Sequence, residues 1–65
     1  MTMTEMTDMT AGRILDDIHQ KGECSFDEDG TSILVDALFP DLTPERQDRL
    51  IGRTNELVND YLRIF

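Results

Sequence analysis

The sequence predicts a small all-α fold with three helices, a long amphipathic C-terminal helix and a flexible N-terminal tail. Apolar residues recur at helical spacing in two segments. Residues that cap helices stand where these segments begin, and Gly or Pro follows where they end. The 38% hydrophobic content is enough for a small core, and 65 residues make one domain at most. We therefore expect a tail over residues 1–9 and a single helical domain over residues 10–65.

The first helix is expected to follow a start that repeats Met and Thr. From Met3 this repeat has a period of three, which is typical of a loose tail of low complexity. Thr and Asp cap helix N-termini well, so the helix should begin between Thr7 and Thr10. Gly22 should end it in a left-handed conformation. One apolar stripe at i, i+3, i+4 and i+7 lies between these limits: Ala11, Ile14, Leu15 and Ile18.

Residues 22–30 are expected to form an acidic loop, followed by a short second helix. This helix should begin at Thr31 or Ser32 and end at Phe39, because Pro40 disfavours its continuation. It is apolar nearly all round, which predicts the most buried element of the fold. The alternative is a β-hairpin that pairs residues 24–26 with 31–35 across a turn.

The third helix has the clearest start signal in the chain. Thr43 suits the N-cap position, Pro44 the first helical position and Glu45 the first turn. The helix should run to about Arg63. Steps of 100° place its apolar residues in one arc of roughly 160°. The arc contains Leu50, Ile51, Thr54, Leu57, Val58, Tyr61, Leu62, Ile64 and Phe65.

Such an arc is wider than a minimal core stripe, and two short helices cannot easily cover it. This predicts a homodimer through the C-terminal helix, centred on Leu57, Tyr61, Leu62 and Phe65. The alternative is that these residues fold back onto the second helix. The predicted core consists of Ile14, Leu15, Ile18, Ile33, Leu34, Leu38, Phe39, Leu50, Ile51, Leu57, Val58 and Tyr61.

Several function classes find no support in the residue types present. One cysteine, Cys24, cannot form an internal disulfide, and His19 is the only histidine, so no zinc cluster is expected. The pair lacks an orienting group for nucleophilic catalysis, and no phosphate-binding or metalloprotease motif occurs. We expect no enzymatic activity and no cofactor. The absence of a targeting or spanning segment, with an unpaired thiol, favours a cytoplasmic protein with no membrane association.

A calcium loop is a further alternative. Residues 25–36 have the length of an EF-hand loop, with Asp27, Asp29 and Gly30 at matching positions. Ser25 stands at the first position and Asp36 at the last, where that loop has Asp and Glu. A solvated acidic turn explains the same residues, and we expect no metal.

The charge of the chain lies almost entirely in its first half. Residues 1–36 hold nine acids and two bases, which gives −7 of the net −8, whereas residues 37–65 hold five acids and four bases. A field of this kind repels nucleic acid and anionic membrane and attracts basic surfaces, most of which bind nucleic acid. The residues expected to contact such a partner are Asp16, Asp17, Glu23, Asp27, Glu28, Asp29 and Asp36.

In size, acidity and helical character the chain resembles the small phage proteins of the DNA-mimic anti-CRISPR class. The resemblance rests on the acid cluster Glu23, Asp27, Glu28 and Asp29 together with Asp16 and Asp17. It covers the character of the whole chain and no motif. It implies binding to a basic groove of a CRISPR surveillance complex and a block on entry of target DNA. The rival interpretation is a helical assembly, adaptor or antitoxin-like regulator that acts through its C-terminal apolar face.

Overall fold

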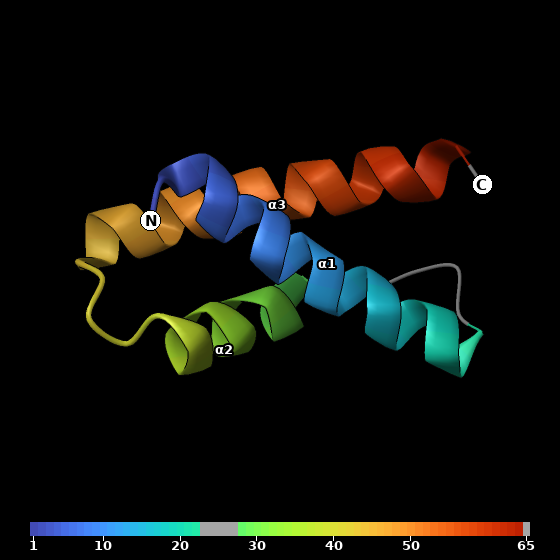
Figure 1. Cartoon of the computed structure of the whole chain (residues 1–65), viewed down its shortest axis with the longest axis horizontal. Helices are drawn as coiled ribbons and strands as arrows, with labels where there is room; N and C mark the ends of the chain where they lie inside the picture. Colours follow the sequence, from blue (N-terminus) through green and yellow to red (C-terminus); the bar gives the residue numbers. More distant parts are fainter. Residues whose placement is uncertain (23–27, 65) are drawn as a thin grey trace.

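The computed structural model describes residues 1–22 and 28–64, without the side chain of Glu28. These residues form three helices, α1 (Met3–Lys21), α2 (Glu28–Leu38) and α3 (Pro44–Ile64), as the sequence predicted. Helices α1 and α3 cross while running in the same general direction, and α2 runs back beside the first half of α1 (Figure 1). The shape is elongated, with extents of 33 × 18 × 17 Å.

Helix α1 begins at Met3, so the predicted tail is wrong for residues 3–9. Thr2 caps the helix: its Oγ1 accepts from the Glu5 backbone N–H at 3.1 Å, and the Thr2 N–H donates to Glu5 Oε1 at 3.2 Å. This reciprocal pair is a capping box. Met6 is buried beside Val35 and Leu50, so the Met-Thr repeat supplies part of the core. Burial of Met6 on other elements, which the repeat itself does not reveal, explains the early start.

The capping box predicts a pH dependence for the first turn of α1. Hydrogen bonds from the Thr2 backbone and hydroxyl lower the pKa of Glu5 below its ordinary value of 4.5. A lowered folded pKa means that the stabilising contribution is complete above pH 4.5 and is lost as the pH falls through the folded value. An NMR titration of the Glu5 carboxyl should show this. Thr2→Ala removes the hydroxyl and keeps the backbone N–H, which is the larger cause, so it should raise the pKa of Glu5 part of the way to its ordinary value. An unchanged pKa in that variant would contradict the capping assignment.

Helix α1 ends as predicted, and α2 begins earlier than predicted. Gly22 has a φ of 71° and its N–H donates to the carbonyl of His19. Helix α2 starts at Glu28, so Asp29 and Gly30 are helical and not in a loop. Acids in a first turn are favoured by the positive end of the helix, which explains the early start.

Two alternatives are wrong for the same reason. A strand over residues 31–35 is excluded because α2 occupies them, and the residues of its partner strand lie outside the described chain. An EF-hand loop needs a sharp turn at its central glycine. Gly30 lies within α2, and Gly22 is the only glycine with a positive φ, all four glycines being described.

Helix α3 begins and ends close to the predicted limits. Thr43 caps it, since its Oγ1 accepts from the Arg46 N–H at 3.3 Å and its carbonyl accepts from the Gln47 N–H at 2.9 Å. The buried residues of the helix are Leu50, Thr54 and Val58, spaced four apart. This stripe faces the other two helices.

The core consists of two clusters. Met6, Val35 and Leu50 form the first, joined by half-buried residues that include Phe39 and Ile51. The second consists of Ala11, Ile18 and Val58, flanked by the half-buried side chains of Ile14, Leu15, Leu57 and Leu62. Helix α2 contributes to the first cluster and has no residue in the second among those described.

Two predicted core residues are exposed, and three buried apolar residues were missing from the predicted core. Ile33 is 73% exposed and Tyr61 48% exposed, whereas Met6, Ala11 and Val35 are buried. Ile33 lies about 200° round the helix from Val35, and one face of α2 packs on the rest of the chain. Helix α2 is therefore not the most buried element: its fully buried side chains are Thr31 and Val35.

A glycine in the exposed middle of α3 offers a gain in stability. A Cβ at Gly52 would meet nothing within 4 Å, and its backbone is helical. Glycine in such a position costs about 1 kcal/mol relative to alanine. We expect Gly52→Ala to raise the free energy of unfolding by roughly that amount in urea titrations. Gly22→Ala, where φ is 71°, is the matched control and should lower it; equal effects of the two changes would contradict this account.

Candidate partner-binding surface

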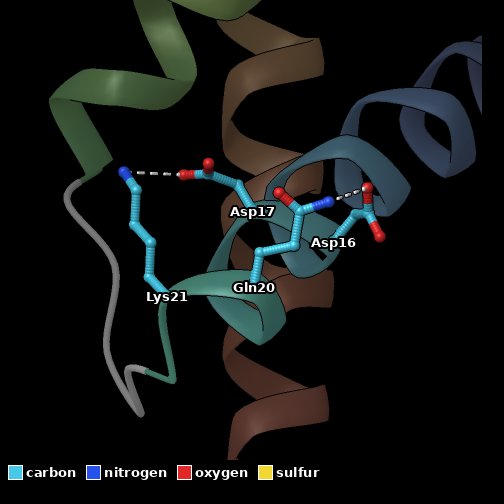
Figure 2. A network of polar contacts seen from close by, with 4 residues as sticks. All are labelled: Asp16, Asp17, Gln20 and Lys21. Carbon is cyan, nitrogen blue, oxygen red and sulfur yellow. Dashed lines mark hydrogen bonds and ion pairs between the residues drawn. The ribbon is translucent and has the colours of Figure 1, made fainter.

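Two of the predicted contact residues lie on the exposed side of α1. Asp17 Oδ2 pairs with Lys21 Nζ at 3.1 Å, and Asp16 Oδ2 accepts from Gln20 Nε2 at 3.5 Å. Figure 2 shows the two carboxylates pointing away from each other, as expected for consecutive residues about 100° apart round the helix. Asp16 and Asp17 therefore do not form a single row.

The contacts of these two acids are local and weak. The Asp17 and Lys21 side chains are both largely exposed and lie four residues apart on one helix. Such pairs contribute about 0.3–0.5 kcal/mol. Lys21 offsets the charge of Asp17, whereas the neutral amide of Gln20 leaves the charge of Asp16 intact. Of the two, Asp16 offers the stronger attraction to a cation.

Asp16 and Asp17 belong to a shallow depression on the outer face of α1. Gly12 lies within this depression, and its missing side chain leaves open space. The depression is lined by Asp8, Met9, Gly12, Arg13, Asp16, Asp17 and Gln20. Asp8 was not among the predicted contact residues, because a tail was expected there. With three acids and one base on its lining, this face has a net negative charge.

A second acidic surface lies on α2. Asp29 and Asp36 are both exposed and stand seven residues apart. At 1.5 Å per residue they are separated by about 10 Å along the helix axis. Ile33 lies between them and is 73% exposed. The outer side of α2 thus carries two carboxylates with a large apolar side chain in the middle.

The sequence around α2 contains only acids among its charged residues. Residues 22–45 hold seven acids and no Lys or Arg: Glu23, Asp27, Glu28, Asp29, Asp36, Asp41 and Glu45. We call this stretch the acid-only segment. Asp41 and Glu45, like Asp29 and Asp36, are exposed. The sequence could have added Asp41 and Glu45 to the predicted set, since no Lys or Arg occurs between Lys21 and Arg46.

The predicted contact set is thus distributed over two helices. Asp16 and Asp17 lie on the second half of α1. Asp29 and Asp36 lie on α2, which runs beside the first half of α1 (Figure 1). Glu28 starts α2, but its side chain is not described, and Glu23 and Asp27 lie outside the described residues. All four described side chains of the set reach solvent.

The predicted self-association set divides into buried and exposed members. Leu57 and Leu62 are half-buried against the second core cluster, so much of their apolar surface is already covered within the chain. Tyr61 is 48% exposed and Ile64, beside the predicted set, 82% exposed. Phe65 lies outside the described residues. A small apolar area near the end of α3 therefore remains in contact with water.

The described part of the chain holds no group of three or more His, Cys, Asp or Glu side chains placed to bind a metal ion. None of its helices combines the length and the apolarity that a membrane span requires. No family model matches the chain, and neither the curated proteins nor the solved structures give a significant match.

Proposed function

We propose that this protein is an inhibitor that occupies a basic, nucleic-acid-binding surface of another protein by charge mimicry. The observation that carries the proposal is the acid-only segment, whose residues Asp29 and Asp36 project into solvent from one helix. Acids kept only for solubility need no such segregation, because mixed charges serve that purpose well. A stretch of 24 residues without a base is suited to a cationic partner.

The spacing of the acids on α2 supports mimicry of a nucleic-acid strand. Phosphates follow one another every 3.4 Å of axis on each DNA strand, so the separation of about 10 Å between Asp29 and Asp36 spans about three phosphates. Carboxylates at these positions can accept charge-assisted hydrogen bonds from Arg and Lys. Ile33 between them adds apolar contact that a phosphate backbone lacks.

The class of partner follows from the same charges. With a net charge of −8 the protein is repelled by DNA, RNA and anionic lipid, so the proposal excludes direct binding to these. The partner is a protein complex with a Lys/Arg-lined groove, and a CRISPR surveillance complex is the specific candidate. Its action belongs in the cytoplasm, where such complexes meet nucleic acid.

Capture from a bacterial lysate tests this proposal. Protein immobilised through its N-terminus is incubated with lysate at low salt and then washed at high salt, and the eluted proteins are identified by mass spectrometry. Exposed charge pairs are screened as the Debye length falls from about 10 Å at 0.1 M to 3 Å at 1 M salt. We expect the salt-released fraction to consist of DNA- or RNA-binding complexes. Partners that survive high salt and bind no nucleic acid would contradict the proposal.

The exposed apolar area of α3 favours one second candidate, a helical assembly or antitoxin-like regulator. Tyr61 and Ile64 are the side chains that a partner could still cover. Under this alternative, Tyr61→Glu abolishes partner binding and acid-to-amide changes on α2 have no effect. Charge mimicry predicts the reverse pattern, so the same two variants separate the two functions.

A further inference from the structure

Three threonines are fully buried in the middle of the core, one on each helix. Thr10, Thr31 and Thr54 are 0%, 1% and 0% exposed. Each stands four residues, about one turn, from a member of the first cluster: Thr10 follows Met6, Thr31 precedes Val35 and Thr54 follows Leu50. Because α2 runs opposite to α1 and α3 (Figure 1), these steps lead in the same direction along the molecule. The three threonines therefore occupy one level, which we call the threonine layer.

The three hydroxyls differ in their hydrogen bonding. Thr10 Oγ1 donates to the Met6 carbonyl at 2.8 Å. Thr31 Oγ1 and Thr54 Oγ1 are buried and have no hydrogen-bond partner within the described residues. A buried hydroxyl without a partner loses its hydration and gains nothing in return, which destabilises the state that buries it. The threonine layer therefore disfavours the closed arrangement at two of its three positions.

The layer also marks where the three-helix part of the molecule ends. On one side lies the first cluster, to which α2 contributes Val35. On the other side lies the second cluster, built from α1 and α3 within the described residues. Thr31 is in the first turns of α2, so this helix begins at the level of the layer. Helices α1 and α3 are held together by both clusters, whereas α2 is attached through one.

From this arrangement we infer that α2 detaches from the α1–α3 pair as a unit before the rest of the chain unfolds. Detachment opens the level of the threonine layer to water, so the Thr31 and Thr54 hydroxyls become hydrated and lose their desolvation cost. The second cluster, with Ala11, Ile18 and Val58, stays closed. Local opening of this kind is expected where few buried apolar side chains hold an element, and Val35 is the fully buried apolar side chain described in α2. The inference concerns the fold alone and does not depend on the proposed function.

Native-state hydrogen exchange, under conditions where the rate reports the opening equilibrium, tests the inference. We expect the amides of residues 32–38 in α2 to exchange faster than those that flank the second cluster in α1 and α3. Thr31→Val and Thr54→Val keep the side-chain shape and remove the unpartnered hydroxyl. Each should slow exchange in α2 by about tenfold.

Thr10→Val is the matched control, because it removes an equally buried hydroxyl that has a partner. It should leave exchange in α2 within about twofold of the parent protein, since the carbonyl that accepts from Thr10 Oγ1 lies within α1 itself. Exchange of α2 at the same rate as α1 and α3 would overturn the inference. So would Thr31→Val and Thr54→Val variants that slow α2 no more than Thr10→Val does.

Discussion

Leu50→Ala is expected to remove a large part of the protein's free energy of unfolding. Leu50 is fully buried and packs in the first cluster with Met6 and Val35, one residue from each of the other helices. Truncation of a buried leucine costs about 2–5 kcal/mol through lost burial and the cavity left behind. At about 0.05–0.15 kcal/mol per residue, a chain of 65 residues has only about 3–10 kcal/mol in total. Circular dichroism during urea titration measures the loss.

Ile33→Ala is the control for this prediction. Ile33 is as apolar as Leu50 and was predicted to be in the core, but it is 73% exposed. Exposed substitutions usually change stability by less than about 0.5 kcal/mol, and alanine favours the helix. We expect the unfolding midpoint of Ile33→Ala to match that of the parent protein. An equal loss in the two variants would show that the outer side of α2 is packed and that the described core is wrong.

The second large effect is expected on partner binding, from reversal of charge on α2. The double variant Asp29→Lys/Asp36→Lys places two cations where the proposal has two phosphate-like anions. Against a Lys/Arg-lined groove each reversal replaces attraction by repulsion, and like charges in an interface cost several kcal/mol. We expect affinity for the captured partner to fall by at least about a hundredfold. Surface plasmon resonance at 0.1 M salt, where the Debye length is about 10 Å, measures it.

The matched control changes the net charge equally at another place. Asp48→Lys/Glu56→Lys alters two exposed acids of α3, outside the acid-only segment. If the position of the charges matters, this variant retains most of its affinity, apart from a modest fall in association rate. Equal losses in the two double variants would show that net charge alone attracts the partner. In that case the acid-only segment would have no special role.

The existence of the helices could be read from local signals, but some of their ends could not. The Thr43-Pro44-Glu45 start of α3 acts within a few residues, and the capping bond of Thr43 confirms it. In α1 several threonines could serve as the cap, and burial of Met6 against Val35 and Leu50 favours the early one. That burial is a tertiary contact and leaves no mark in the Met-Thr repeat.

The buried face of α2 could not be predicted from its composition. The helix is apolar nearly all round, so periodicity does not separate Val35, which is buried, from Ile33, which is exposed. Contact with α1 and α3 makes that choice. The threonine layer escaped prediction for a related reason: Thr10 and Thr31 stand outside the apolar pattern, although their spacing from Met6 and Val35 matches one turn.

The acidic character of the candidate surface was visible in the sequence, and its geometry was not. The excess of acids over residues 1–36 requires only a count. That Asp16 and Asp17 point apart follows from the helical pitch (Figure 2). Their positions relative to Asp29 and Asp36 depend on how α2 packs beside α1, which no local pattern encodes. The exposure of Ile33 between the two acids of α2 likewise became evident only in the folded chain.

Displacement by DNA tests the central claim most directly. The captured partner, bound to immobilised protein at 0.1 M salt, where screening extends about 10 Å, is challenged with duplex DNA or with the same mass of neutral dextran. Charge mimicry predicts that DNA releases the partner in proportion to its concentration and that dextran does not. A partner that stays bound at saturating DNA occupies a different surface, and the proposed function would then be wrong.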